Sequence, residues 1–226
     1  KYFQTQTPGI SNGVSSITGV VADTKFSHKR GFYTAPFSLS ITCATPAVTI
    51  RYTMDGTAPT ATSGLVYSTP FPIAKTTVVR AAAYSNGSLP SDVDAQTYLF
   101  LSDVIYQSTN GVAPPGWPAT WGANVVDYGM DPDIVNAAAY KDTIKSDLQA
   151  IPTFSIVADV NDIFGANGIY SNPGGDTIAW ERPCSIELIY PDDTEGFQIN
   201  CGIRIRGGYS RSTSNPKHAF RFFFRQ

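Results

Sequence analysis

The stretch that decides the fold of the first half of the chain is IRYTMDGTAPT, residues 50–60. Up to Met54, apolar and aromatic side chains alternate with polar ones, which is the period of a half-buried β-strand. Asp55 and Gly56 then supply a turn, because Gly adopts positive φ angles without steric cost. Pro59 lacks an N–H group and ends the strand pairing. The stretch therefore predicts a strand followed by a tight turn, in which Asp55 stabilises the turn and is not a catalytic acid.

Other segments of the first half show the same alternating pattern. Together, the predicted strands cover residues 37–43, 48–54, 77–84 and 93–100. Short strands separated by turn residues at this spacing are typical of antiparallel β-sandwiches. We therefore expect an Ig-like β-sandwich at residues 23–100, which folds on its own, and before it a linker or the tail of an upstream domain at residues 1–22.

Residues 101–147 have the composition of a connector with short helices. The sequence APPGWP, which starts at Ala113, holds three prolines, and these exclude a helix or a central strand there. Asp131 followed by Pro132 is a preferred helix start, with Asp as the N-cap and Pro in the first helical position. A second short helix is expected at residues 142–148.

An aromatic cluster in this connector is a candidate carbohydrate site. It consists of Trp117, Trp121 and Tyr128. Flat aromatic rings suit the apolar faces of sugars, so the cluster can form a stacking platform. Tryptophans in a loop also fill the seam between two domains, and the sequence favours that second role.

A period of two returns after residue 153 and is clearest in a predicted hairpin, residues 184–190 and 197–205. Apolar residues alternate on both strands, so one face of the hairpin is apolar. Cys184 and Cys201 belong to the apolar sets of their strands, and we expect them on that same face. They are either close enough for a disulfide in an exported protein or present as buried thiols.

The fold class predicted for the whole chain is mainly β: the Ig-like sandwich, the short helical connector, and a β-rich (α+β) partial domain at residues 148–226. The last strand, residues 218–225, carries Phe220, Phe222 and Phe224 on one face and stops one residue before the sequence does. Domains seldom end within an uncapped apolar strand. We therefore expect the chain to be a piece of a longer protein.

Composition excludes several classes of function. Charged residues make up 15% of the chain, against about 25% in typical soluble domains. Two histidines, and three cysteines without metal-ligand spacing, argue against a metal centre. The net charge of -2 argues against a nucleic-acid partner, since such binders are usually basic over a whole face. The apolar runs are also too short for a transmembrane segment.

The basic residues nevertheless gather in one place. Residues 202–226 hold six of the 16 Lys and Arg and none of the 18 Asp and Glu. A glycine-containing loop lies there between two strands, and cations flank it. Its backbone N–H groups and cationic side chains can cradle a phosphate, although the spacing is not that of a P-loop. The candidate residues are Arg206, Gly207, Gly208, Arg211 and Lys217. A solvated basic hairpin face is the alternative.

The first half resembles a known family. The YTMDG and APT sequences within residues 50–60, together with the later Tyr67, Pro70 and Ile73, are similar to the chitobiase/β-hexosaminidase C-terminal domain, also called the fibronectin-associated repeat. The resemblance covers roughly residues 24–100. It implies a β-sandwich module of a type that is mostly a non-catalytic appendage of secreted enzymes and surface proteins.

The second half resembles the CotH kinase family of atypical secreted kinases. An arginine-glycine-x-serine loop followed by proline-lysine-x-x-phenylalanine-arginine carries this resemblance, as do the upstream sequences IPT, GIY and WERP, over roughly residues 148–226. It implies that Lys217 faces nucleotide phosphates, with Arg206 and Arg211 beside it. Gly208 and Tyr209 depart from the family pattern, which has asparagine or serine after the glycine.

The CotH resemblance also implies ATP and a divalent metal as cofactors of the parent protein, and none for this piece alone, because the family's catalytic aspartates lie further along the chain. A third resemblance, of KYF and TPGISN in the opening residues, is to the end of a lamin-tail domain. The three modules occur together in large exported bacterial proteins.

These features predict a non-catalytic piece of a large secreted or cell-surface bacterial protein. It is expected to act as a structural or binding module for polysaccharide or for other surface proteins. The alternative is the ATP-binding part of a CotH-like Ser/Thr kinase, whose remaining machinery the chain lacks.

Overall fold

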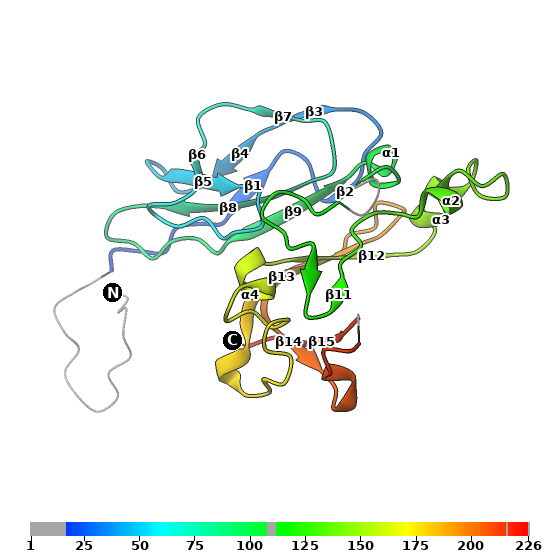
Figure 1. The fold of residues 1–226 in the computed structure, drawn as a ribbon. Helices are drawn as coiled ribbons and strands as arrows, with labels where there is room; N and C mark the ends of the chain where they lie inside the picture. Colours follow the sequence, from blue (N-terminus) through cyan, green and yellow to red (C-terminus); the bar gives the residue numbers. More distant parts are fainter. Residues whose placement is uncertain (1–16, 108–111, 216, 226) are drawn as a thin grey trace.

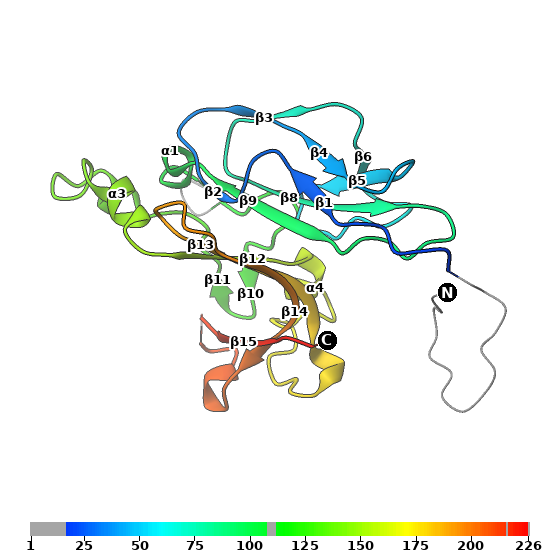
Figure 2. The same ribbon diagram turned by 180° about the vertical axis from the view of Figure 1, so that it is seen from behind.

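The computed structural model describes residues 17–107, 112–215 and 217–225. The predicted mainly β fold is confirmed. Figure 1 and the opposite view in Figure 2 show three stacked layers: a small outer layer, a larger central sheet, and a second domain packed on the other side of that sheet.

The first domain is a sandwich of short strands around a five-stranded sheet with the order β2-β9-β8-β5-β6. Two pairs, β1 with β4 and β3 with β7, form the outer layer over it. The strands are β1 (Thr24–Phe26), β2 (Gly31–Phe32), β3 (Phe37–Leu39), β4 (Ile41–Cys43), β5 (Thr49–Thr53), β6 (Leu65–Val66), β7 (Phe71–Ile73), β8 (Thr77–Tyr84) and β9 (Asp94–Leu99). All neighbours in the five-stranded sheet are antiparallel except β2 and β9.

The sandwich core lies between the outer layer and the five-stranded sheet. Its fully buried members include Leu39, Ile41, Val79 and Tyr98. Leu39 and Ile41 belong to the alternating segment 37–43, as expected. That segment is not one strand, however: β3 and β4 pair with different partners, β7 and β1.

The start of the sandwich differs from the expected boundary at residue 23. Thr18 and Val21 donate backbone hydrogen bonds to the carbonyl groups of Gly87 and Leu89, and Val21 is buried. Residues 17–22 therefore lie along the sandwich. The rest of the expected linker, and the residues behind the lamin-tail resemblance, fall outside the described part of the chain.

The predicted turn after β5 is confirmed. Asp55 Oδ1 accepts hydrogen bonds from the Thr57 N–H, at 3.0 Å, and from the Thr57 hydroxyl, at 2.6 Å. Gly56 has φ +85°, and a Cβ there would lie 2.8 Å from the carbonyl oxygen of Ala158 in the second domain. The turn therefore packs closely against the backbone of that domain.

In its described residues, the connector contains three short helices and one small hairpin. They are α1 (Leu101–Val104), α2 (Pro132–Val135), α3 (Ile144–Gln149), and the pair β10 (Thr120–Trp121) with β11 (Asn124–Val125). Asp131 is the N-cap of α2, as predicted, because its carboxylate accepts the Asp133 N–H at 2.9 Å. The second helix lies close to its expected place.

The second domain is a four-stranded antiparallel sheet with the order β12-β13-β14-β15. Its strands are β12 (Thr153–Val157), β13 (Arg182–Ile189), β14 (Gln198–Arg206) and β15 (Ala219–Phe223), with the helix α4 (Val160–Phe164) and the 3₁₀ turns η2 (Ile178–Trp180) and η3 (Tyr209–Arg211) beside them. The predicted apolar face of the hairpin is confirmed, since Cys184, Ile203 and Ile205 form a core with Ile169.

The opposite face of this sheet is also covered, which the sequence analysis did not predict. Ser185 and Glu187 point away from that apolar core, and both are fully buried. They are covered by the sandwich, whose β9 contacts both β13 and β14. The five-stranded sheet therefore forms the middle layer of the molecule and is covered on both faces. The expectation of an independently folding sandwich did not include this packing of the second domain on its sheet.

Candidate functional site

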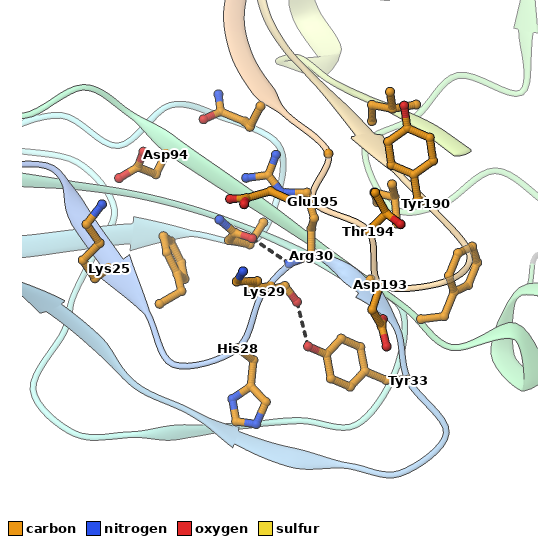
Figure 3. A pocket seen from close by; sticks show the side chains of 18 of the residues that line it. Lys25, His28, Lys29, Arg30, Tyr33, Asp94, Tyr190, Asp193, Thr194 and Glu195 are labelled. Carbon is orange, nitrogen blue, oxygen red and sulfur yellow. Dashed lines mark hydrogen bonds between the residues drawn. The ribbon is translucent and has the colours of Figure 1, made fainter. Parts of the chain in front are cut away.

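A cavity with a volume of about 740 Å³ lies where the sandwich meets the β13–β14 hairpin. The sandwich contributes the segment from Thr24 to Tyr33 together with Asp94 and Gln96 of β9. The hairpin contributes residues on both sides of its turn, from Leu188 to Gln198. We call this space the interdomain pocket (Figure 3).

A polar network below the pocket joins the two domains. Glu187 of β13 accepts a hydrogen bond from the Thr97 N–H of β9, at 3.1 Å, and another from the Thr97 hydroxyl. The Arg30 Nε lies 3.5 Å from Glu187 Oε1, and the Ser155 and Thr97 hydroxyls are 2.7 Å apart. Burial raises the pKa of Glu187, and the bonds from Thr97 and the charge of Arg30 oppose this. We call this group of residues the seam network.

A second buried cation lies in the same seam. Arg80 of β8 is 7% exposed and donates to the Gly56 carbonyl at 2.9 Å. Burial lowers the pKa of Arg80, and the carboxylate of Glu187 is one of the charges that oppose this. Asn200 adds a further link between the domains, since its side-chain amide donates to the Val93 carbonyl at 2.8 Å. The domains thus meet through hydrogen-bonded polar groups and not through an apolar surface alone, while Arg30 Nη1 and Arg80 Nε are buried without a hydrogen-bond partner among the described residues.

The two walls of the pocket carry opposite charge. Lys25, Lys29 and Arg30 come from the sandwich, and the exposed Asp193 and Glu195 come from the hairpin turn (Figure 3). Within the part of the chain that the structure describes, neither lysine is within ion-pair distance of either acid. These charged ends therefore face one space without neutralising each other through direct contact.

The pocket is also lined by Tyr33, Asp94 and Thr24. The Tyr33 hydroxyl donates to the Lys29 carbonyl at 2.6 Å; burial raises the pKa of Tyr33, and the negative charge of Asp193 adds to the shift. Asp94 accepts the Thr24 hydroxyl at 2.5 Å, and burial raises the pKa of Asp94. The pocket thus combines aromatic surface, hydrogen-bonding groups and both signs of charge.

The residues predicted to bind phosphate lie far from this pocket, at the other end of β14. Arg206 and Arg211 line a second cavity with Arg204 and Arg221, but its volume is only about 20 Å³, room for about one water molecule. Arg211 donates to the Gly174 carbonyl at 3.3 Å. Lys217 is exposed and is not among the residues that line this cavity.

The two glycines of that loop differ in their backbone conformation and in the space available for a side chain. Gly207 has φ +127°, and a Cβ there would collide with the Ser210 hydroxyl, whereas Gly208 has open space around it. The described residues contain no group of three or more His, Cys, Asp or Glu side chains arranged to hold a metal ion. The geometry therefore does not form a pocket for a triphosphate with its metal in the described part of this loop.

The two tryptophans of the aromatic cluster have different ring partners and are joined indirectly, through Phe164 and Tyr170. Trp121 is 8% exposed and packs on Tyr170 and His218, with ring centroids 5.0 and 4.9 Å away. Trp117 is 39% exposed and meets Tyr128 edge to face at 5.8 Å. Trp121 thus fills space under the second domain, while Trp117 and Tyr128 keep a surface on which a sugar can stack.

The cysteines of the hairpin share its apolar face, as expected from the alternation, and they also lie directly opposite each other. Cys184 pairs with Cys201 in the β13–β14 register, and both pack on the apolar core. Their sulfur atoms are 3.4 Å apart, and the described structure holds them as free thiols.

Sequence reasoning missed the interdomain pocket and the seam network. Two signals in the sequence pointed to a covered sheet. One is VVRAAA, residues 78–83, which is almost continuously apolar, as in strands buried on both faces. The other is Ile189, which interrupts the alternation of β13 and is in fact buried beside the polar Glu187.

Comparison with known proteins supports one of the three resemblances. Residues 28–95 match the family model of the chitobiase/β-hexosaminidase C-terminal domain, a carbohydrate-associated module. No curated protein and no solved structure matches the chain. The likenesses to CotH kinases and lamin-tail domains stay predictions. In the described residues, no helix has the length and apolar character needed to cross a bilayer.

Proposed function

We propose that this chain is a non-catalytic module that binds polysaccharide, and that the interdomain pocket is its binding site. The observation that carries the proposal is the pair of oppositely charged walls around about 740 Å³ of space. That volume lies in the usual range for small-molecule sites, about 300–1,000 Å³.

The charge pattern selects the kind of ligand. An anion would be attracted by Lys25 and Lys29 but repelled by Asp193 and Glu195, and the reverse would hold for a cation. An apolar ligand would remove all of these charged groups from water without giving them partners, which is costly. A neutral ligand with many hydroxyl groups can donate to the carboxylates and accept from the ammonium groups. A sugar has this property.

The aromatic lining fits the same ligand. Tyr33 and Tyr190 both line the pocket, one from each domain, and aromatic surfaces pack on the apolar faces of sugar rings. The family match is compatible with this role, since chitobiase and β-hexosaminidase are named for the amino-sugar oligosaccharides on which they act. We further propose that the parent protein is secreted or displayed on the cell surface of a bacterium.

Isothermal titration of the full chain with N-acetylhexosamine oligosaccharides, and with glucose oligosaccharides for comparison, tests the proposal. We expect Lys29→Ala and Glu195→Ala each to lower the affinity about tenfold, which corresponds to about 1.4 kcal/mol, because each removes a charged hydrogen-bonding partner. Both side chains are exposed, so neither change should affect folding. Lys145→Ala is the matched control, since Lys145 is exposed on α3 and outside the pocket.

Trp117→Ala separates the pocket from the aromatic surface of the connector. If this substitution abolishes binding while Lys29→Ala and Glu195→Ala leave it unchanged, the sugar binds at Trp117 and the pocket assignment is wrong. If none of the oligosaccharides binds the unmodified chain, the proposed function is wrong for these sugars.

The alternative, an ATP-binding part of a CotH-like kinase, has less support from the geometry. Its favourable observation is the cluster of Arg204, Arg206, Arg211 and Arg221 around one small cavity. The cavity is too small for a triphosphate, and Lys217 lies outside it. Phosphate binding at this loop stays a prediction, for which weakening of ATP binding by salt and by Lys217→Ala is the expected sign.

A further inference from the structure

The two cysteines of the β13–β14 hairpin have a geometry that permits a covalent bond. Cys184 and Cys201 are directly opposite in the register, and residues in that position have Cα atoms about 4.5–5.5 Å apart. Disulfides form at Cα separations of about 4.4–6.8 Å. The sulfur atoms already lie 3.4 Å from each other, so a bond needs an approach of the two side chains and no change in register.

We propose that Cys184 and Cys201 form a redox modification site. A small-molecule disulfide such as oxidised glutathione oxidises the pair to a cross-strand disulfide, in two steps with a fixed order. Cys201 reacts first with the external disulfide, and Cys184 resolves the mixed disulfide. This inference does not depend on what the interdomain pocket binds.

Burial assigns the order of the two steps. Cys184 is 2% exposed and lies in the core with Ile169 and Ile203, so an external disulfide cannot reach it in the folded chain. Cys201 is only half-buried at the margin of the same core. Burial raises the pKa of both thiols, and since the thiolate is the reacting form, we expect the first step to be slow.

The oxidation proceeds by two thiol–disulfide exchange steps. The Cys201 thiolate attacks one sulfur of the external disulfide, which releases one small thiolate and leaves a mixed disulfide on Cys201. Cys184 then loses its proton and attacks the Cys201 sulfur, and the second small thiolate leaves. The chain has lost two protons and two electrons, and the electrons have reduced the external disulfide to two thiols.

The bond would enclose the hairpin wall of the interdomain pocket. Every pocket residue that the second domain contributes lies between the two cysteines: Leu188, Ile189, Tyr190, Asp193, Thr194, Glu195, Gly196 and Gln198. A disulfide therefore closes a covalent loop around this wall. Closing a loop of this size restricts the unfolded chain, and we expect the melting temperature of the oxidised chain to rise by about 5–10 °C.

The third cysteine must be removed from the experiment. Cys43 lies on β4 in the other domain, where its thiol donates to the Ala22 carbonyl at 3.1 Å. A serine can make the same hydrogen bond, so Cys43→Ser is a suitable background. In that background we compare the full chain with Cys184→Ser and Cys201→Ser after incubation of the folded proteins with oxidised glutathione.

Intact-mass spectrometry reads the outcome. The chain with both cysteines is expected to lose two hydrogens and to carry no glutathione. Cys184→Ser is expected to accumulate one glutathione on Cys201, and Cys201→Ser is expected to stay unmodified for the same period. Reductant should reverse the mass change and the rise in melting temperature together.

Three results would overturn the inference. One is a stable glutathione adduct, or no reaction, on the chain that keeps both cysteines. The second is modification of Cys201→Ser as fast as that of Cys184→Ser, which would reverse the order of reaction. The third is an unchanged melting temperature after oxidation. Should the buried serine of Cys184→Ser prevent folding, Cys184→Ala supplies the same test without a buried hydroxyl group.

Discussion

The centre of the five-stranded sheet, at β8 and β9, is buried on both faces, but the two faces are held by different chemistry. On one face Leu39, Val79 and Tyr98 pack in an apolar core. On the other, Thr97 and Arg30 meet the second domain through the seam network around Glu187. An apolar core is stabilised by area removed from water, whereas a buried polar seam is stable only while each group keeps its partner.

The sharpest test of this difference is the removal of one side chain from each face. Glu187→Ala leaves the Thr97 N–H and hydroxyl without this acceptor and the Arg30 guanidinium without its ion-pair partner. We expect it to lower the free energy of unfolding by about 3–5 kcal/mol. Leu39→Ala removes a fully buried apolar side chain and should cost about 2–5 kcal/mol. Urea denaturation at pH 7 measures both.

Glu187→Gln shows whether such a loss of stability comes from the missing hydrogen-bond acceptor or from the missing charge. Glutamine has nearly the shape of glutamate and keeps an oxygen that accepts the Thr97 N–H. If the seam depends on satisfied hydrogen bonds, Glu187→Gln should cost less than about 1 kcal/mol, although Glu187→Ala costs several. Equal losses for Gln and Ala would show that the charge, and not the acceptor, holds the seam.

A smaller effect is expected when a donor is removed from the same network. Thr97→Val keeps the shape of the side chain but removes the hydroxyl that bonds both Glu187 and Ser155. We expect a loss of about 1–2 kcal/mol in the free energy of unfolding, because the buried Glu187 carboxylate then loses a donor and the Ser155 hydroxyl loses a partner. Thr42→Val, at an exposed position of β4, is the matched control and should change stability by less than about 0.5 kcal/mol. Similar values for both would place Thr97 outside the network.

The comparison also shows what a sequence can reveal about such a molecule. The apolar face of the sheet and the apolar face of the hairpin were predicted, because alternation marks one buried side of a strand. The polar side of β13 has the same alternation whether water or another domain covers it. Ser185 and Glu187 are therefore solvent-facing by pattern, and only the packing of β13 on β9 buries them.

The pocket could not be predicted from the sequence either, because it also forms only when the two domains pack together. Its walls come from the segment around Lys29 and the turn around Glu195, which are far apart in the chain. Neither segment contains a motif, and charged residues next to turns are ordinary. The arginine loop and the tryptophans drew attention because their residues are close in sequence. The structure gives Trp117 and Trp121 different environments, and Lys217 is not among the residues that line the cavity of Arg206 and Arg211.

The mildest test of the seam is its dependence on pH. Burial raises the pKa of Glu187 above its usual value, so the folded state holds the proton more tightly than the unfolded state does. A raised pKa contributes stability that is fully present below the unfolded value, about 4.3, and is lost as the pH rises through the folded value. Glu187→Gln cannot titrate and therefore lacks this contribution.

The stability of the unmodified chain relative to Glu187→Gln should therefore fall as the pH rises from about 4 to about 8, since the other titrating groups affect both chains alike. Urea denaturation of the two proteins at a series of pH values gives this difference directly. Arg30 and Arg80 are the cations that oppose the trend. If their attraction exceeds the cost of burial, the difference will rise with pH instead, and the seam will be an ion pair in which the charge of Glu187 is favourable.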